Sequence, residues 1–163
     1  MAEYLFRKML QEKGGKLIQE IEVSSAGLGR MNKESLKFAK ANAWYAFKSW
    51  LKRGPDKYIS AAMLRRGLDV SKHKSRKLKE EEVEKADLII TMERKQKEKV
   101  LSRYSSAKGK VFTLKEISGV IGSSDIKDPA GSSPEDFEAC VREIEECLTE
   151  GMERILGYLA SGG

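Results

Sequence analysis

The side chains in this sequence that could take part in covalent chemistry are few: two cysteines, Cys140 and Cys147, and one histidine, His73. A thiolate can act as a nucleophile where its surroundings lower its pKa. The cysteines lie seven residues apart in one helical pattern, which separates them by roughly 10 Å along the helix axis. Because a disulfide needs Cα atoms much closer than this, the two cysteines cannot bridge each other.

The residues around the cysteines favour a structural role for both thiols. Phe137 and Ile144 share their helical stripe, and this pattern is typical of cysteines that serve as small buried hydrophobic residues. With no other cysteine in the sequence, we expect a reducing compartment and a cytoplasmic location. A lone histidine is more often structural than catalytic. The sequence has no cluster of His, Cys and Asp with metal-ligand spacing, so we expect no metal and no cofactor.

Composition and charge limit the classes of protein that fit. With 163 residues and 40% hydrophobic content, the chain is long enough for one domain with a core and too short for two. Lysine plus arginine exceed aspartate plus glutamate by 31 to 25, for a net charge of +6. That charge favours an anionic partner, or else it covers solvated faces. No secretory signal and no membrane-spanning run is recognisable, so no membrane partner is expected.

The first elements that could position a site are a helix and a strand. Apolar residues between Ala2 and Leu10 recur with helical spacing, and the glycines at 14 and 15 end the helix. Residues 17–23 alternate apolar with polar side chains and run into Ser24-Ser25-Ala26-Gly27. This alternation predicts a strand that leads into a tight loop.

Residues 31–53 hold most of the aromatic side chains in the first half of the chain, interleaved with lysines. A basic aromatic stretch of this kind, here around Trp44 and Trp50, occurs on nucleic-acid and membrane surfaces. The same spacing also fits an ordinary amphipathic helix, which we favour. Nucleic acid is therefore not expected as a partner.

The rest of the chain alternates helices and strands, and a loop follows at 119–131. Helices are predicted at 59–64, 80–86 and 93–104 and from Pro134 to the carboxyl end, with Ser133 as the cap; strands are predicted at 87–92 and 111–114. The order predicts an α/β fold, doubly wound, with a mainly parallel sheet and helices on both faces. Such folds usually open with a strand that runs into a phosphate-binding loop, whereas this sequence opens with a helix.

Six segments together resemble the low-molecular-weight protein-tyrosine-phosphatase family: MAEYLFRKML, VSSAG, GLDVSKHKSRKL, ADLIITM, KVFTLKE and DIKDPAGSSPEDF. The last two resemble the bacterial branch that includes protein-arginine phosphatases. The resemblance implies a single phosphatase-like domain over residues 1–163. It also implies a hydrolase that acts on phosphotyrosine or phosphoarginine in a phosphorylated protein, through a cysteinyl-phosphate intermediate and without a metal or other cofactor.

The resemblance also assigns site residues. Asp128 matches the family's general acid, which protonates the leaving group and later helps water to attack. Asp125 and Pro129 belong to the same acid loop. Ser25 and His73 match positions that hold the phosphate loop in shape. By itself the Asp-Pro dipeptide would indicate only a turn before the last helix.

The sequence departs from the family at the nucleophile. The family's loop is a Cys, five residues, then Arg and Ser or Thr, placed between a first strand and a helix that begins near Met1-Ala2-Glu3. The positions six residues after the two cysteines are Glu146 and Glu153, so neither cysteine matches. We therefore expect the domain to be N-terminally incomplete, with the first strand and phosphate loop missing. A start at an internal methionine, or a fragment, is favoured over a pseudoenzyme or a permuted chain.

Two further departures concern the substrate cleft and the rival functions. Ala130 stands where the family usually has an aromatic side chain, and 31–53 is expected to be an insertion. The alternative function is a non-catalytic pseudophosphatase or phosphate-recognising binding module. An arsenate reductase of the same fold would need redox cysteines, and residues 86–113 contain none.

Overall fold

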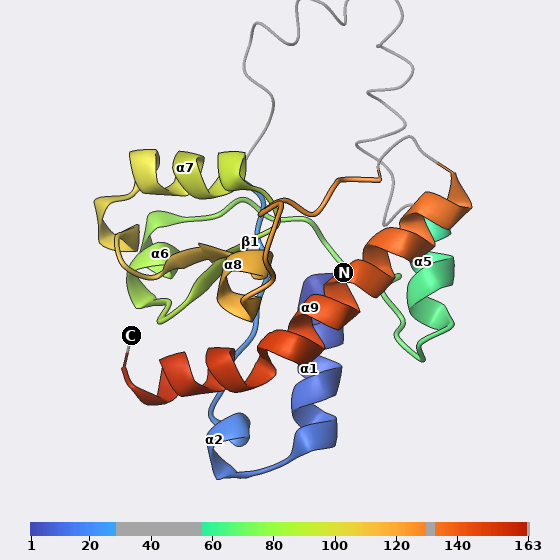
Figure 1. Ribbon diagram of the computed structural model, residues 1–163, viewed down its shortest axis with the longest axis horizontal. Coiled ribbons are helices and arrows are strands. Elements are labelled where there is room, and N and C mark those ends of the chain that lie inside the picture. Colours follow the sequence, from blue (N-terminus) through green and yellow to red (C-terminus); the bar gives the residue numbers. More distant parts are fainter. Residues whose placement is uncertain (29–56, 130–132, 163) are drawn as a thin grey trace, which may run out of the picture.

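The computed structural model of the protein describes residues 1–28, 57–129 and 133–162. The amphipathic helix expected at 31–53 and the position of Ala130 lie outside these ranges. Three helices form one side of the molecule: α1 (Ala2–Lys13), α5 (Lys57–Leu64) and the long α9 (Pro134–Ala160), which contacts both of the others (Figure 1). Their ends agree with the predicted signals, since Gly14 follows α1 with a φ of 65° and Ser133 caps α9.

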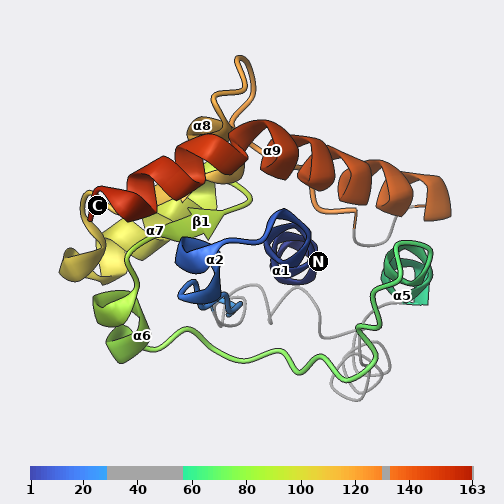
Figure 2. The same ribbon diagram turned by 90° about the horizontal axis from the view of Figure 1, so that it is seen from below.

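Strands β1 (Ile89–Thr91) and β2 (Val111–Thr113) pair in parallel, with Ile89 opposite Val111. Side chains on a strand alternate between its two faces. Ile89 and Val111 pack with the buried Val83 of α6 (Glu80–Lys85) and Val100 of α7 (Arg94–Arg103), whereas Ile90 packs against the cluster that includes α1 and α9. Helices thus cover both faces of a parallel sheet (Figure 2), which confirms the predicted fold class.

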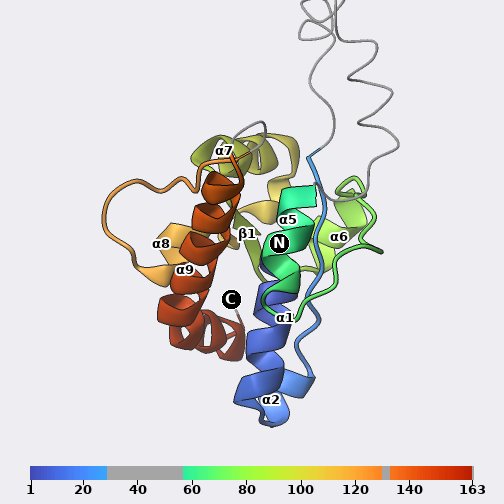
Figure 3. The ribbon, with the colours of Figure 1, turned by 90° about the vertical axis from the view of Figure 1, so that its right-hand side faces the viewer.

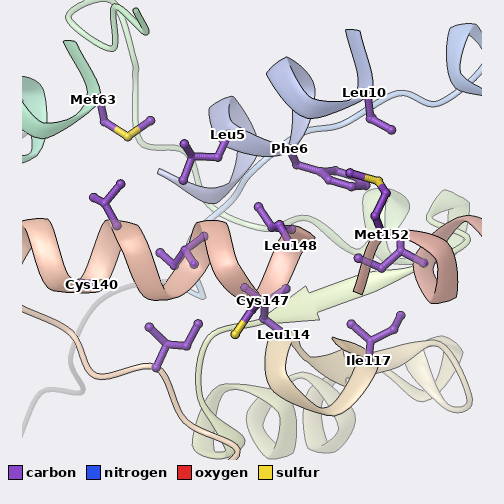
Figure 4. Packing of buried hydrophobic residues seen from close by; sticks show 14 of the residues in the cluster. Leu5, Phe6, Leu10, Met63, Leu114, Ile117, Cys140, Cys147, Leu148 and Met152 are labelled. Carbon is purple, nitrogen blue, oxygen red and sulfur yellow. The ribbon is translucent and has the colours of Figure 1, made fainter. Parts of the chain in front are cut away.

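The larger core is organised around α9. Its apolar stripe packs against α1, α5 and α8 (Leu114–Ser118), and Cys140 and Cys147 are buried in it as predicted (Figure 4). Ser118 Oγ donates a hydrogen bond to the backbone oxygen of Cys147 at 2.6 Å. Helices α8 and α9 approach each other so closely that a Cβ on Gly151 would lie 2.5 Å from Ser118 Oγ. No helix in the described ranges is both long and apolar enough to cross a membrane.

Some short helices were not predicted, and one predicted strand is wrong. The 3-10 turn Ser105–Ala107 and helix α8 lie where no regular structure was predicted, except that Leu114 was predicted as the end of a strand. The signal for α8 was readable, because Thr113 and Glu116 form a capping box in which Thr113 Oγ1 accepts from the Glu116 amide.

The strand predicted at 17–23 is instead the short helix α2 (Lys16–Gln19) followed by irregular chain. Within the described residues, the segment itself has no bridge, and the chain after it makes one isolated bridge, between Gly27 and Lys77. Arg7 Nε donates to the Val23 oxygen at 3.0 Å, which is a side-chain contact and not a ladder bond. Alternation makes a strand only where a neighbouring strand supplies the ladder, and within the described chain no strand does so.

An ion-pair network joins α5 to α9. The Arg66 guanidinium contacts the carboxylates of Glu138 and Glu145, each at 2.7 Å. The hydrogen bond to Glu138 raises the pKa of Arg66, and the same contact lowers the pKa of Glu138. The network fixes the end of α5 against the first turns of α9.

Candidate active site

The amino end of α1 collects the two predicted support residues. Ser25 Oγ donates a hydrogen bond to the carboxylate of Glu3, in the first turn of the helix. The ring of His73 packs edge-on against the ring of Tyr4, with centroids 5.8 Å apart. Ser25 and His73 come from segments far apart in sequence, so the fold brings both to the place where a loop preceding α1 would lie.

The acid loop is tethered at the carboxyl end of β1. Asp125 Oδ1 accepts a hydrogen bond from the backbone amide of Arg94, the first residue of α7, at 2.6 Å. The Ile126 amide donates to the oxygen of Met92, the residue after β1, at 2.8 Å. The carboxyl ends of parallel strands are where α/β proteins place their ligands. Asp125 and Ile126 thus anchor the segment that leads to Asp128 at this edge.

Asp128 and Pro129 border a cleft against the start of α9. The Asp128 side chain is exposed and Pro129 is buried. The cleft has a volume of about 210 Å³ and is lined by Lys127, Asp128, Pro129, Asp136, Ala139, Cys140 and Glu143. Two of its acidic side chains also hold the scaffold: Asp136 caps α9 by accepting from the Ser133 amide at 3.1 Å, and Glu143 pairs with Lys115 at 2.6 Å.

The pKa of the Cys140 thiol responds both to Asp128 and to the ammonium at the amino end of α1. Burial raises the pKa of Cys140 first, and the carboxylates of Glu143 and Asp128 raise it further, while the Met1 ammonium opposes them. Burial in turn lowers the pKa of the Met1 ammonium. Both the Asp128 carboxylate and the Met1 ammonium therefore lie in the surroundings of the Cys140 thiol.

The same observations exclude Cys140 as the nucleophile of this cleft. The thiol is 7% exposed, and its raised pKa keeps it protonated at neutral pH. A nucleophilic cysteine needs the opposite surroundings, with a lowered pKa and an open approach. Cys147 is buried too, and burial also raises its pKa. The prediction that both are structural is confirmed.

Sequence reasoning missed part of the cleft lining. Lys127 and the α9 residues Asp136, Cys140 and Glu143 were not assigned to the site. The signal was available in part, because these α9 positions are separated by four and three residues and so share one face of the predicted helix. What the sequence did not reveal is that this face turns toward the acid loop.

The comparison with protein families agrees with this geometry. The sequence model of the low molecular weight phosphotyrosine protein phosphatase family matches residues 46–157. The chain belongs to this family.

Individual relatives of this phosphatase family carry two activities in their names. The chain is 39% identical over 79 residues to the protein-arginine-phosphatase of Bacillus subtilis, covering 48% of this chain and 51% of that protein. It is 32% identical over 93 residues to the probable low molecular weight protein-tyrosine-phosphatase EpsP of Ralstonia nicotianae, covering 57% and 61%. The matches thus span about half to three fifths of these relatives' lengths.

Solved structures of the family share the fold over nearly the whole chain. The low molecular weight protein tyrosine phosphatase of Bacillus subtilis superposes with a TM-score of 0.69 at 27% identity, covering 94% of this chain and 86% of that one. A mutant of the arginine phosphatase YwlE with a phosphorylated active site serine gives 0.68 at 27% identity, covering 91% and 82%. The T. tengcongensis phosphatase, at 23% identity and a TM-score of 0.72 with 94% and 88% covered, shows the fold alone.

Proposed function

We propose that residues 1–163 belong to a protein phosphatase that hydrolyses phosphotyrosine or phosphoarginine through a cysteinyl-phosphate intermediate, and that residues preceding Met1 supply its nucleophile. The observation that carries the proposal is the position of Asp128, which follows the tether at the carboxyl end of β1 and, like the Met1 ammonium, acts on the Cys140 thiol. A carboxylate there can deliver a proton to a leaving group bound in front of the helix.

The amino end of α1 supports an anion site. The first backbone N–H groups of a helix have no partner within it, and its dipole favours negative charge. Among the described residues, no side chain caps this end. The group that occupies it is the Met1 ammonium, whose burial lowers its pKa. A positive charge is disfavoured there, whereas a phosphate-binding loop that continues into the helix satisfies the same N–H groups.

The sheet supports the proposal independently. The apolar side chains of β1 and of residues 21–23 remain only half-buried, although they pack against the main core. Segment 21–26 has no ladder with any described strand. A strand that precedes Met1, pairs with β1 and runs into α1 would cover these side chains and deliver its following loop to the helix end.

The proposed reaction has two steps. A cysteine thiolate attacks phosphorus, the bond from phosphorus to the leaving oxygen or nitrogen breaks, and Asp128 gives that atom its proton. Asp128 then takes a proton from water, the water oxygen attacks phosphorus, and the phosphorus–sulfur bond breaks to release inorganic phosphate. The YwlE mutant with a phosphorylated active site serine fits a covalent step of this kind. Two buried free cysteines also fit a reducing compartment, so we place the enzyme in the cytoplasm.

The deciding experiment compares two proteins: the 163-residue chain and the chain extended by the residues encoded upstream of Met1. We expect hydrolysis of an aryl phosphate by the extended protein and none by the 163 residues. An in-frame stop upstream without codons for a Cys-x5-Arg loop would contradict the proposal, as would turnover by the 163 residues alone.

A second candidate is a non-catalytic pseudophosphatase or phosphate-recognising module. One observation favours it: both cysteines of the 163-residue chain are buried, whereas the cleft beside Asp128 is present. Binding of inorganic phosphate or of a phosphotyrosine peptide to the extended protein, with no turnover, would select this candidate. Turnover of phosphoarginine or phosphotyrosine peptides by the extended protein would instead identify the substrate class.

A further inference from the structure

The segment between α5 and α6 carries a concentrated positive charge. Residues 72–79, here called the basic strip, contain five cationic side chains and no acidic one: Lys72, Lys74, Arg76, Lys77 and Lys79. All five residues are exposed. Arg76 is paired with Glu82, but within the described residues Lys72, Lys74 and Lys77 form no ion pair with a carboxylate. Charge that is not neutralised within the fold is available to a partner.

The basic strip is held in place at both ends. Near its start, the ring of His73 packs against Tyr4 in the first turn of α1. Near its end, the Gly27 amide donates to the Arg76 oxygen and the Leu78 amide donates to the Gly27 oxygen, each at 2.8 Å. The backbone that carries the lysines is therefore held from the first turn of α1, at His73, to Gly27, at Arg76 and Leu78.

The two sides of this helix end differ in charge. The cleft on one side carries Asp128, Asp136 and Glu143 against a single Lys127. The basic strip lies on the other side, so that the amino end of α1 is found between the segment leading to α9 and the segment joining α5 to α6 (Figure 3). Acidic residues of a bound peptide would be repelled by the cleft and attracted by the strip, which fixes the direction in which such a peptide lies.

We propose that the basic strip binds acidic residues that flank the phosphorylated residue of a protein substrate. The inference rests on the proposed function for the identity of the ligand, but the surface itself can be tested without catalysis. Exposed charge pairs are individually weak, so each lysine strengthens binding by roughly two- to five-fold, and salt reduces the effect. Lys72, Lys74 and Lys77 together are expected to contribute about tenfold or more.

Fluorescence anisotropy of labelled peptides on the 163-residue chain gives a direct test. An unphosphorylated peptide rich in Glu and Asp should bind more tightly than its Gln and Asn counterpart, and the preference should shrink as salt is raised. The variant Lys72→Gln/Lys74→Gln/Lys77→Gln should bind the acidic peptide about tenfold more weakly. The matched control is Lys95→Gln/Lys99→Gln/Lys108→Gln, which removes the same charge from exposed positions on and after α7 and should bind like the parent.

Three results would overturn the proposal. Equal weakening in both triple variants would show that net charge alone attracts the peptide. Equal affinity for the acidic and the neutral peptide would remove the specificity. Tighter binding of a single-stranded oligonucleotide, lost only in the strip variant, would assign the surface to nucleic acid. Far-UV circular dichroism of both variants checks that they fold.

Turnover by the extended protein separates this proposal from the proposed function. With an active enzyme, the strip variant should lose about tenfold in kcat/KM for a phosphopeptide with acidic flanks and keep its rate on an aryl phosphate. If the extended protein hydrolyses neither substrate, the proposed function fails. The peptide-binding experiment then still shows whether the basic strip binds acidic peptides. If the strip variant loses kcat/KM equally for the phosphopeptide and the aryl phosphate, the basic strip is not a docking surface.

Discussion

Two regions of the molecule are held together by different kinds of contact: the crossing of α8 over α9, and the surroundings of the amino end of α1. At the crossing, backbones touch, Ser118 bonds to the Cys147 oxygen, and the Arg154 guanidinium donates to the Ser118 oxygen at 3.0 Å. At the helix end, single side chains such as Arg7 and Ser25 hold segments that have no backbone ladder.

The difference separates scaffold from site. The crossing buries apolar side chains almost completely, as in Leu114, Leu148 and Ile155 at 0–2% exposure. Around the helix end, Ile21, Val23 and Ile90 remain half-buried. Burial of apolar surface is the main favourable term in folding, so the crossing is expected to dominate stability, whereas the strand and ligand proposed above would add the most at the helix end.

The largest effect is expected at the site. In the extended enzyme, Asp128→Asn should lower kcat by roughly 10² to 10⁴, because the leaving group loses its proton donor. Steady-state kinetics with an aryl phosphate measures this change. Asp87→Asn removes the same charge before β1, away from the cleft, and should leave kcat unchanged. A fully active Asp128→Asn enzyme would mean that another group donates the proton.

The next effect is expected at the crossing. Gly151→Ala places a Cβ 2.5 Å from Ser118 Oγ and 2.8 Å from Ser118 Cα. Forcing helices α8 and α9 apart should lower the free energy of unfolding by about 2 kcal/mol, even though alanine favours a helix. Gly157→Ala is the matched control, since nothing lies within 4 Å of its added Cβ, and it should stabilise α9 by up to about 1 kcal/mol. Urea titrations in which both variants behave alike would contradict the close approach.

A smaller effect is expected at residues 21–26, where the Arg7 side chain takes the place of the backbone hydrogen bonds of a strand. Arg7→Gln removes the guanidinium that bonds to the Val23 oxygen and pairs with Glu3. Because the Arg7 side chain is 52% exposed, the loss should be about 1 kcal/mol or less. Hydrogen exchange should be fast in residues 21–26 and slow in the buried middle of α9, and the variant should accelerate only the former. Strong protection of 21–26 in the 163-residue chain would mean that the segment is already paired.

The smallest effect depends on pH. The hydrogen bond from Arg66 lowers the folded pKa of Glu138, so the stabilisation is present above its unfolded pKa of about 4.3 and is lost as pH falls through the lower folded value. The Glu138 side chain is 36% exposed, and solvent screening limits the contribution to under about 1 kcal/mol. Glu138→Gln should therefore be less stable than the parent at pH 7, and the difference should shrink as the pH falls through the lowered folded pKa of Glu138. A constant difference across this range would contradict the linkage.

Local signals in the sequence predicted most elements correctly. The Ser133 cap, Pro134 and the apolar stripe predicted α9, and Gly14 predicted the end of α1, because these signals act within a few residues. The strand at 17–23 was wrong for a non-local reason, since a strand forms only beside a partner. In the site, the resemblance assigned roles to Asp128, Ser25 and His73, and the last two contact the first turn of α1. It did not reveal Cys140 or Lys127, whose positions depend on how α9 packs against the acid loop.

The tether of the acid loop limits how this protein can diverge in sequence. Arg94 and Met92 hold Asp125 and Ile126, and Asp128 follows two residues later. One residue inserted after Ile126 would displace the carboxylate by up to about 3.5 Å, farther than a proton can be passed directly. Ile121 is 99% exposed and nothing lies within 4 Å of a Cβ added at Gly122, so related proteins can lengthen or shorten the turn at these two residues. The spacing between backbone anchor and acid is thus a tighter constraint than the identity of the residues around it.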